Sequence, residues 1–148
     1  MQLRSLIISM SLCVAATAAQ AQTLQLITND EASLPNATGQ IASRGVTRGP
    51  AIKMLSPDPA SKNIKGPFDI KIAFEPRGGS KIDPATATLT YLKNPVVDLT
   101  PRVKSGIKPE GIDVSKAAVP AGEHQIRVTV KDDEGRQTSQ VFSLRVVN

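Results

Sequence analysis

The sequence of 148 residues contains a single cysteine, Cys13, which lies in an apolar segment near its start. The rest of the chain can therefore form no disulfide, no cysteine metal site and no thiolate nucleophile. Its folded part must be stabilised by packing alone.

Aromatic residues are also scarce, since the chain has no Trp, one Tyr and three Phe. Proteins that bind sugars or single-stranded nucleic acids usually stack aromatic rings on their ligands. We expect Phe68, Phe74 and Phe142 to lie in the core, which leaves only Tyr91 for such a role. The composition therefore disfavours a sugar-stacking surface, and we expect no nucleic-acid partner.

Histidine occurs once, so any Ser-His-Asp triad or histidine metal site would have to include His124. Its phase with Ile126 and Val128 predicts a half-buried ring at the start of a strand, and no Gly-x-Ser-x-Gly motif is present. The acids of the 132–134 segment could gather around calcium, but EF-hand spacing is absent and a solvated turn accounts for them. We therefore expect no catalytic residue, no metal site and no cofactor.

Residues 1–21 combine a charged start at Arg4, an apolar stretch and the small-residue site Ala19-Gln20-Ala21. This order predicts a secretory signal peptide that is cleaved after Ala21. The stretch is too short to span a membrane, and Cys13 lacks the small preceding residue of a lipoprotein signal. We expect a periplasmic or secreted protein whose mature chain has no transmembrane span and no lipid anchor. Eighteen cations less Arg4, against thirteen anions, leave the mature chain a net charge of +4.

Residues 22–50 are rich in Asn, Ser, Thr, Gly and Pro and show little periodicity. This composition predicts a linker or a loosely docked, flexible arm. Within it, Thr28-Asn29-Asp30-Glu31 has the form of a capping box, which predicts a short helical turn that ends before Pro35.

From residue 51 to 148, short runs of alternating apolar and polar residues are separated by Pro and Gly. The clearest runs are 68–75 and a hairpin whose two strands carry Ile126 and Leu144 around an Asp-Asp-Glu-Gly turn. Weaker strands are expected at 52–55, 85–92, 96–103 and 112–114. About seven strands and no helical period predict an all-β domain of two packed antiparallel sheets.

Residues 120–136 read PAGEHQIRVTVKDDEGR. They resemble the last hairpin of bacterial immunoglobulin-like and fibronectin type III-like modules, which often read Gly-x-aromatic-x-aliphatic-x-aliphatic and then Asp-x-x-Gly. Asp132 and Gly135 fit the turn, whereas His124 stands where such modules more often carry Tyr. The resemblance covers roughly residues 51–147 and implies an immunoglobulin-like antiparallel β-sandwich with a binding, adhesive or spacer role.

If the usual sheet pairing holds, threonines of the 85–92 strand lie beside cations of the last hairpin on one outer face. The candidate ligand face consists of Thr88, Thr90, Arg127, Lys131 and Arg145, with Thr86, Thr129 and Ser143 beside them. Such a face could receive an envelope protein or an anionic surface polymer, although dispersed charge and threonine also serve ordinary solvation.

These observations predict an exported, non-catalytic binding module of the bacterial cell envelope, whose ligand is unknown. It would bind through a sheet face or by adding a strand at an exposed edge. Two alternatives stay open: a small periplasmic hydrolase that uses His124 with a serine or a carboxylate, and a structural spacer that docks through residues 22–50.

Overall fold

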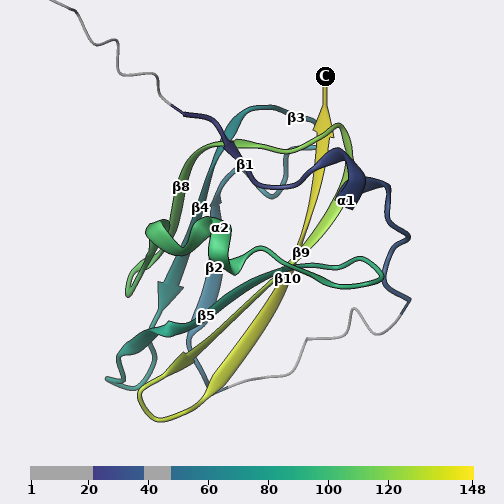
Figure 1. Ribbon diagram of the computed structural model, residues 1–148. Coiled ribbons are helices and arrows are strands. Elements are labelled where there is room, and N and C mark those ends of the chain that lie inside the picture. The colour runs from purple at the N-terminus through teal and green to yellow at the C-terminus, as the bar shows by residue number, and fades with distance from the viewer. Residues whose placement is uncertain (1–21, 39–47) are drawn as a thin grey trace, which may run out of the picture.

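The computed structural model describes residues 22–38 and 48–148, so the expected signal peptide lies outside the described residues. Within the described part, ten strands form two sheets of five strands each, with only short helical segments (Figure 1). The predicted all-β character is confirmed.

The first sheet has the strand order β1-β8-β4-β2, with β7 also paired to β8. β1 runs parallel to β8, whereas the other neighbours are antiparallel. The strands of this sheet are β1 (Leu24–Gln25), β2 (Ala51–Ser56), β4 (Phe68–Glu75), β7 (Ile107–Lys108) and β8 (Gly111–Ala118).

The second sheet has the order β3-β10-β9-β5-β6, in which β3 runs parallel to β10. Both sheets are therefore mixed, and the prediction of purely antiparallel sheets is wrong at these two short strands. The strands of this sheet are β3 (Ile64–Lys65), β5 (Ile82–Tyr91), β6 (Val97–Asp98), β9 (Gly122–Asp132) and β10 (Gln137–Val147). The helical segments are α1 (Asn29–Ser33), α2 (Thr100–Val103) and a 3-10 helix (Lys104–Gly106).

The two strongest sequence patterns are confirmed. β4 has the predicted bounds, and Ile70, Ile72 and Phe74 are buried. β9 and β10 run side by side, with their connecting turn at one end and the C-terminus at the other (Figure 1). Gly135 adopts a φ of +76° in that turn, a conformation that glycine reaches without a steric penalty.

The predicted strand at 96–103 is wrong for most of its length, because only Val97–Asp98 is a strand and α2 follows it. Pro101 lies in the first turn of α2, where its missing N–H costs nothing, whereas in a strand it would remove a ladder hydrogen bond. Within the described residues the structure has ten strands where about seven were predicted, and the three additional strands are β1, β3 and β7, which have two residues each.

Residues 22–38, the first part of the segment expected to be a loosely docked arm, pack against the sheets, whereas residues 39–47 of that segment lie outside the described residues. Leu26 and Ile27 are 0% exposed, and Leu26 N donates to Ala118 O at 3.0 Å. The predicted capping box is present: Thr28 Oγ1 accepts from Glu31 N at 3.2 Å, and Glu31 Oε2 accepts from Thr28 N at 2.9 Å. A two-residue strand is too short to show a period, so the sequence pattern did not reveal this docking.

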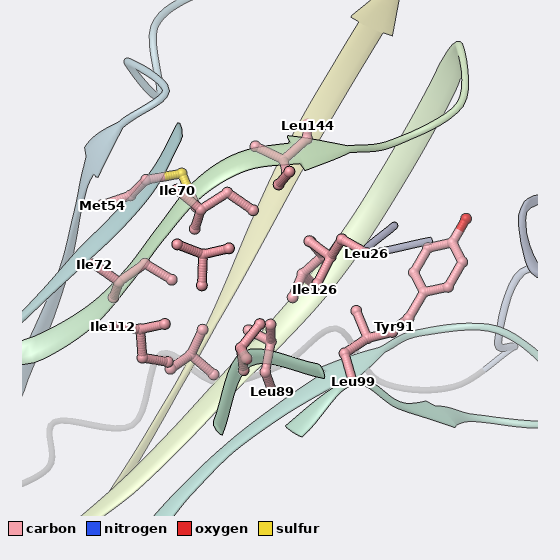
Figure 2. Close-up of a cluster of buried hydrophobic side chains, with 14 of the residues drawn as sticks. Leu26, Met54, Ile70, Ile72, Leu89, Tyr91, Leu99, Ile112, Ile126 and Leu144 are labelled. Carbon is pink, nitrogen blue, oxygen red and sulfur yellow. The ribbon is translucent and has the colours of Figure 1, made fainter. Parts of the chain in front are cut away.

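The core lies between the two sheets. Figure 2 shows side chains from both sheets in one cluster, with Leu26 of the N-terminal segment among them. Tyr91 is at the margin of this cluster, and its hydroxyl oxygen points away from the aliphatic side chains. Of the three phenylalanines expected in the core, Phe74 is buried, whereas Phe68 and Phe142 are partly buried and pack against its border.

Candidate functional site

The five residues expected to form a ligand face lie on one side of the second sheet. Thr88 is opposite Thr129 and Thr90 is opposite Arg127 in the β5–β9 ladder. Directly opposed residues point to the same side of a sheet, and every second residue along β9 shares that side. Lys131 of β9 therefore lies on this outer side, as does Arg145 of β10, which is opposite Glu123. We call the surface formed by Thr88, Thr90, Arg127, Lys131 and Arg145 the cationic face.

Hydroxyl groups occupy the middle of the cationic face. Thr129 lies between Thr88 and Ser139, and its Oγ1 is 2.8 Å from the Ser139 Oγ. Thr86 does not offer a free hydroxyl there, because it donates to Asp83 O at 2.7 Å and accepts from Lys131 N at 2.9 Å. These two hydrogen bonds connect β5 and β9 at the register shift between Asp83 and Thr88, where the regular ladder is interrupted.

The cations of this face differ in their partners. Arg145 forms a long ion pair with Glu123 at 3.9 Å, and both side chains are more than half exposed. An exposed pair of this kind contributes little, since water and salt screen it. Arg127 and Lys131 form no ion pair with any residue that the structure describes. Asp83 is opposite Lys131 in the ladder, so this side of the sheet carries a carboxylate as well.

His124 is buried at 2% exposure, which is deeper than the half-buried ring expected from its phase. Its Nε2 lies 2.8 Å from Pro120 O, and its Nδ1 lies 2.7 Å from the Tyr91 hydroxyl. A carbonyl oxygen can only accept, so Nε2 carries the hydrogen and Nδ1 of the neutral ring accepts from the tyrosine. Burial lowers the pKa of His124, and the positive charge of Lys93 lowers it further. Burial also raises the pKa of Tyr91 to about 12, so the tyrosine keeps the proton it donates.

A surface hollow of about 310 Å³ is lined by His124 together with Ser61, Ser143 and Glu123. These residue types could in principle form a hydrolytic site with a histidine. Both ring nitrogens of His124 are bonded to Tyr91 and Pro120, however, so the ring offers no free nitrogen to the hollow.

Two cations fasten the N-terminal segment to the domain. Lys93 is 6% exposed; its Nζ donates to Ala32 O at 3.0 Å and to Asn36 Oδ1 at 2.9 Å, and it lies 5.4 Å from the centre of the Tyr91 ring. Arg102 holds Glu31 through two bonds, with Nη2 at 2.6 Å from Oε1 and Nη1 at 2.8 Å from Oε2. The hydrogen bonds from Arg102 hold the pKa of Glu31 at about 2, well below its ordinary value of 4.5.

The acidic turn between β9 and β10 uses its first carboxylate internally. Asp132 is 3% exposed, its Oδ1 accepts from Arg136 N at 2.8 Å, and its Oδ2 accepts from Arg136 Nε at 2.8 Å. Asp132 is thus a buried residue that closes the turn, whereas Asp133 and Glu134 are exposed. Across residues 22–38 and 48–148, no three His, Cys, Asp or Glu side chains lie in a group that could hold a metal ion.

No helical segment in the described ranges has the length and apolar character needed to cross a membrane. The comparisons with known proteins gave no match: no family model fits the chain, and no curated protein or solved structure was found to be similar.

Proposed function

We propose that this protein is an exported, non-catalytic binding module of the bacterial cell envelope, and that the cationic face attaches it to an anionic polymer or an acidic protein surface. The observation that carries the proposal is the ladder register, which brings Arg127 and Lys131 onto one hydroxyl-rich side of the second sheet. Neither cation forms an ion pair with a described residue, although Asp83 is opposite Lys131 and Asp98 is opposite Thr90 on the same side.

The chemistry of this face fits an extended anionic ligand. Arginine can donate two parallel hydrogen bonds to a carboxylate, sulfate or phosphate group, and lysine adds a mobile point charge. The Thr88 hydroxyl can donate to a further oxygen of the same ligand, whereas the Thr129 hydroxyl is bonded to Ser139 and the Thr90 hydroxyl donates to Arg127 O. Because Arg127 and Lys131 lie four residues apart on β9 and Arg145 lies on β10, the cations are spread over an open sheet surface and suit an extended ligand better than a small molecule enclosed in a pocket.

The strand arrangement supports an immunoglobulin-like fold for the module. The order β2-β4-β8 in one sheet and β10-β9-β5 in the other corresponds to the A-B-E and G-F-C strands of such sandwiches. β6 then takes the place of the additional strand beside C that variable-type domains carry. Such sandwiches host many functions, so this likeness supports the fold and adds nothing about the ligand.

Export is supported by the pattern of residues 1–21, which has the charged start, apolar middle and small-residue site of a signal peptide. It would bring the module to anionic polymers on the outer side of the cytoplasmic membrane.

The contacts favour this function over the two alternatives. A hydrolase would need a free nitrogen on His124, and both nitrogens are engaged in the buried pair with Tyr91 and Pro120. A spacer that docks through residues 22–50 would need that segment to be free, whereas its first part is buried at Leu26 and Ile27.

The experiment compares two double variants of equal charge change. Arg127→Ser with Lys131→Ser removes both unpaired cations from the cationic face. Lys71→Ser with Lys108→Ser removes two exposed cations from the first sheet. Binding is measured on immobilised dextran sulfate, with neutral dextran as the blank and with increasing salt.

We expect the first variant to bind on the order of tenfold more weakly at low salt, because two exposed contacts of about 0.7 kcal/mol each are lost. The second variant should bind like the parent chain. Equal weakening of the two variants, or no binding of the parent above the neutral blank, would contradict the proposal.

A further inference from the structure

A surface hollow of about 310 Å³ lies where the loop between β2 and β3 meets one end of the β9–β10 ladder. The loop, residues 57–63, forms one wall, and residues of β9 and β10 form the rest. The buried residues His124 and Leu144 also border it. We call it the loop hollow, and its outward-facing side chains are Ser61, Lys62, Glu123, Gln125, Ser143 and Arg145.

The strand residues of the loop hollow lie on the outer side of the second sheet. Glu123 is opposite Arg145, and Gln125 is opposite Ser143 in the β9–β10 ladder. Opposed residues point to the same side of a sheet, and every second residue along a strand shares that side. Gln125 is therefore next to Arg127 of the cationic face, and Arg145 belongs to both surfaces. The loop hollow lies at one end of the cationic face.

Two sets of contacts fix the loop that forms the other wall. Ser61 N donates to Asp58 O at 2.8 Å, and Ala60 N donates to Asp58 Oδ1 at 2.9 Å, so the loop contains a closed turn. Two residues after Lys62, Ile64 is buried and pairs with β10. The loop is thus positioned against β10 before any ligand arrives, which reduces the entropic cost of binding.

Most polar side chains of the loop hollow are unpartnered. Within residues 22–38 and 48–148, no hydrogen bond or ion pair engages the side chains of Ser61, Lys62, Gln125 and Ser143. Glu123 and Arg145 form only the exposed pair at 3.9 Å, which water and salt screen. The hollow therefore presents two cations, two hydroxyls, one amide and one carboxylate to solvent.

The main chain of Ser143 adds a donor on the side of the loop. Asp132 N donates to Arg136 O, and bonded and non-bonded pairs alternate in an antiparallel ladder. The even-numbered residues of β9 and β10 therefore bond to each other, and the N–H of Ser143 points away from β9. Among the described residues β3 pairs with β10 only at residues 146 and 147, so this N–H has no strand partner.

We propose that the loop hollow binds one acidic sugar unit, a hydroxyl-bearing ring that carries a phosphate, sulfate or carboxylate group. Lys62 on the loop and Arg145 on β10 donate to the anionic group from two walls. Glu123 and the carbonyl group of Gln125 accept hydrogen bonds from ring hydroxyls, and the serine hydroxyls can donate or accept.

The mixed set of groups selects a ligand that has both features. A simple anion would leave the Glu123 carboxylate facing it without a donor. A neutral sugar would leave Lys62 and Arg145 without an acceptor. An acidic sugar unit satisfies both, and it needs no aromatic side chain for stacking.

This inference rests on the proposed function for the origin of its ligand, because the acidic unit would belong to the anionic polymer that lies along the cationic face. The loop hollow itself is tested with small molecules that are too short to cover that face. The two ideas can therefore fail separately.

The experiment titrates the full chain with four probes: glucuronate, glucose 6-phosphate, glucose and inorganic phosphate. The amide signals of Ser61, Gln125 and Ser143 are followed by nuclear magnetic resonance. We expect saturable shifts of these signals with the two acidic sugars, weaker shifts with inorganic phosphate and none with glucose. The tighter of the two acidic sugars identifies the preferred anionic group.

Three variants test the assigned contacts. Lys62→Gln should raise the Kd for the tighter acidic sugar about tenfold, because one hydrogen bond to a charged group is lost. Lys65→Gln makes the same charge change at an exposed residue outside the hollow and should leave the Kd nearly unchanged. Ser143→Leu changes no charge but fills the hollow, and should abolish the saturable shifts. Circular dichroism checks that each variant is folded.

Four results would overturn the inference: no saturable shift with either acidic sugar, equal shifts with glucose, equal weakening by Lys62→Gln and Lys65→Gln, or shifts centred on Arg127 and Lys131. The last result would place the sugar on the cationic face and would exclude the loop hollow. A double variant at Arg127 and Lys131 that keeps both glucuronate binding and the parent's binding to dextran sulfate would support the hollow and contradict the proposed function.

Discussion

Replacing Tyr91 by Phe removes one hydroxyl group and leaves the shape of the core almost unchanged. In the folded protein that hydroxyl donates to His124 Nδ1 at 2.7 Å, and both residues are at most 2% exposed. The variant therefore leaves the lone pair of a buried imidazole without a donor. Leaving a buried acceptor unsatisfied costs about 1–3 kcal/mol, and we expect Tyr91→Phe to lower the free energy of unfolding by that amount.

The assay is urea unfolding of four chains: the parent, Tyr91→Phe, His124→Leu and the double variant. Once the imidazole is gone, the tyrosine hydroxyl has lost its acceptor, so the two substitutions should not add. We expect a coupling energy of about 1 kcal/mol or more between them. Additive effects, or a cost of Tyr91→Phe below about 0.5 kcal/mol, would refute the buried hydrogen bond.

The pH dependence gives the same pair a second readout. Burial lowers the pKa of His124 in the folded state relative to its ordinary 6.5. The unfolded chain then binds more protons below pH 6.5, so stability is lost as the pH falls through that value, by at most about 1.4 kcal/mol per pH unit. His124→Leu should remove this contribution. An unchanged slope in that variant would show that His124 is charged, or solvated, in the folded protein.

The remaining predictions concern the N-terminal segment. Leu26→Ala should lower the free energy of unfolding by about 2–5 kcal/mol, because it opens a cavity at a fully buried position. Leu55→Ala, at a 64% exposed position, is the control and should change that free energy by no more than about 0.5 kcal/mol. Equally small effects of the two substitutions would mean that the N-terminal segment does not unfold together with the domain. Glu31→Gln should lower the free energy of unfolding by about 1–2 kcal/mol at neutral pH, because it removes the carboxylate that Arg102 holds. The parent chain should lose stability as the pH falls from 4.5 towards about 2, where this carboxylate becomes protonated, and the variant should not show that loss. Acid titration of both chains, followed by circular dichroism, measures this difference, and parallel titration curves would contradict it.

Two-residue periodicity predicted the elements in which one side of a strand is buried and the other is wet. β4 meets that condition over 8 residues and β9 over 11, whereas in β10 only Leu144 and Val146 are buried. β1 and β3 do not, because each forms over 2 residues beside a parallel partner far along the chain. A pattern confined to two residues has no period, so only tertiary contacts define such strands.

The buried polar contacts were only partly predictable. His124 was in phase with Ile126 and was expected to be half-buried, but its partner Tyr91 lies 33 residues away. A signal for Tyr91 was available, since it alternates with Ala87 and Leu89 towards the same buried side of β5. Lys93 gave no such signal, because its position next to Ala32 and Asn36 depends on how α1 folds back onto the domain.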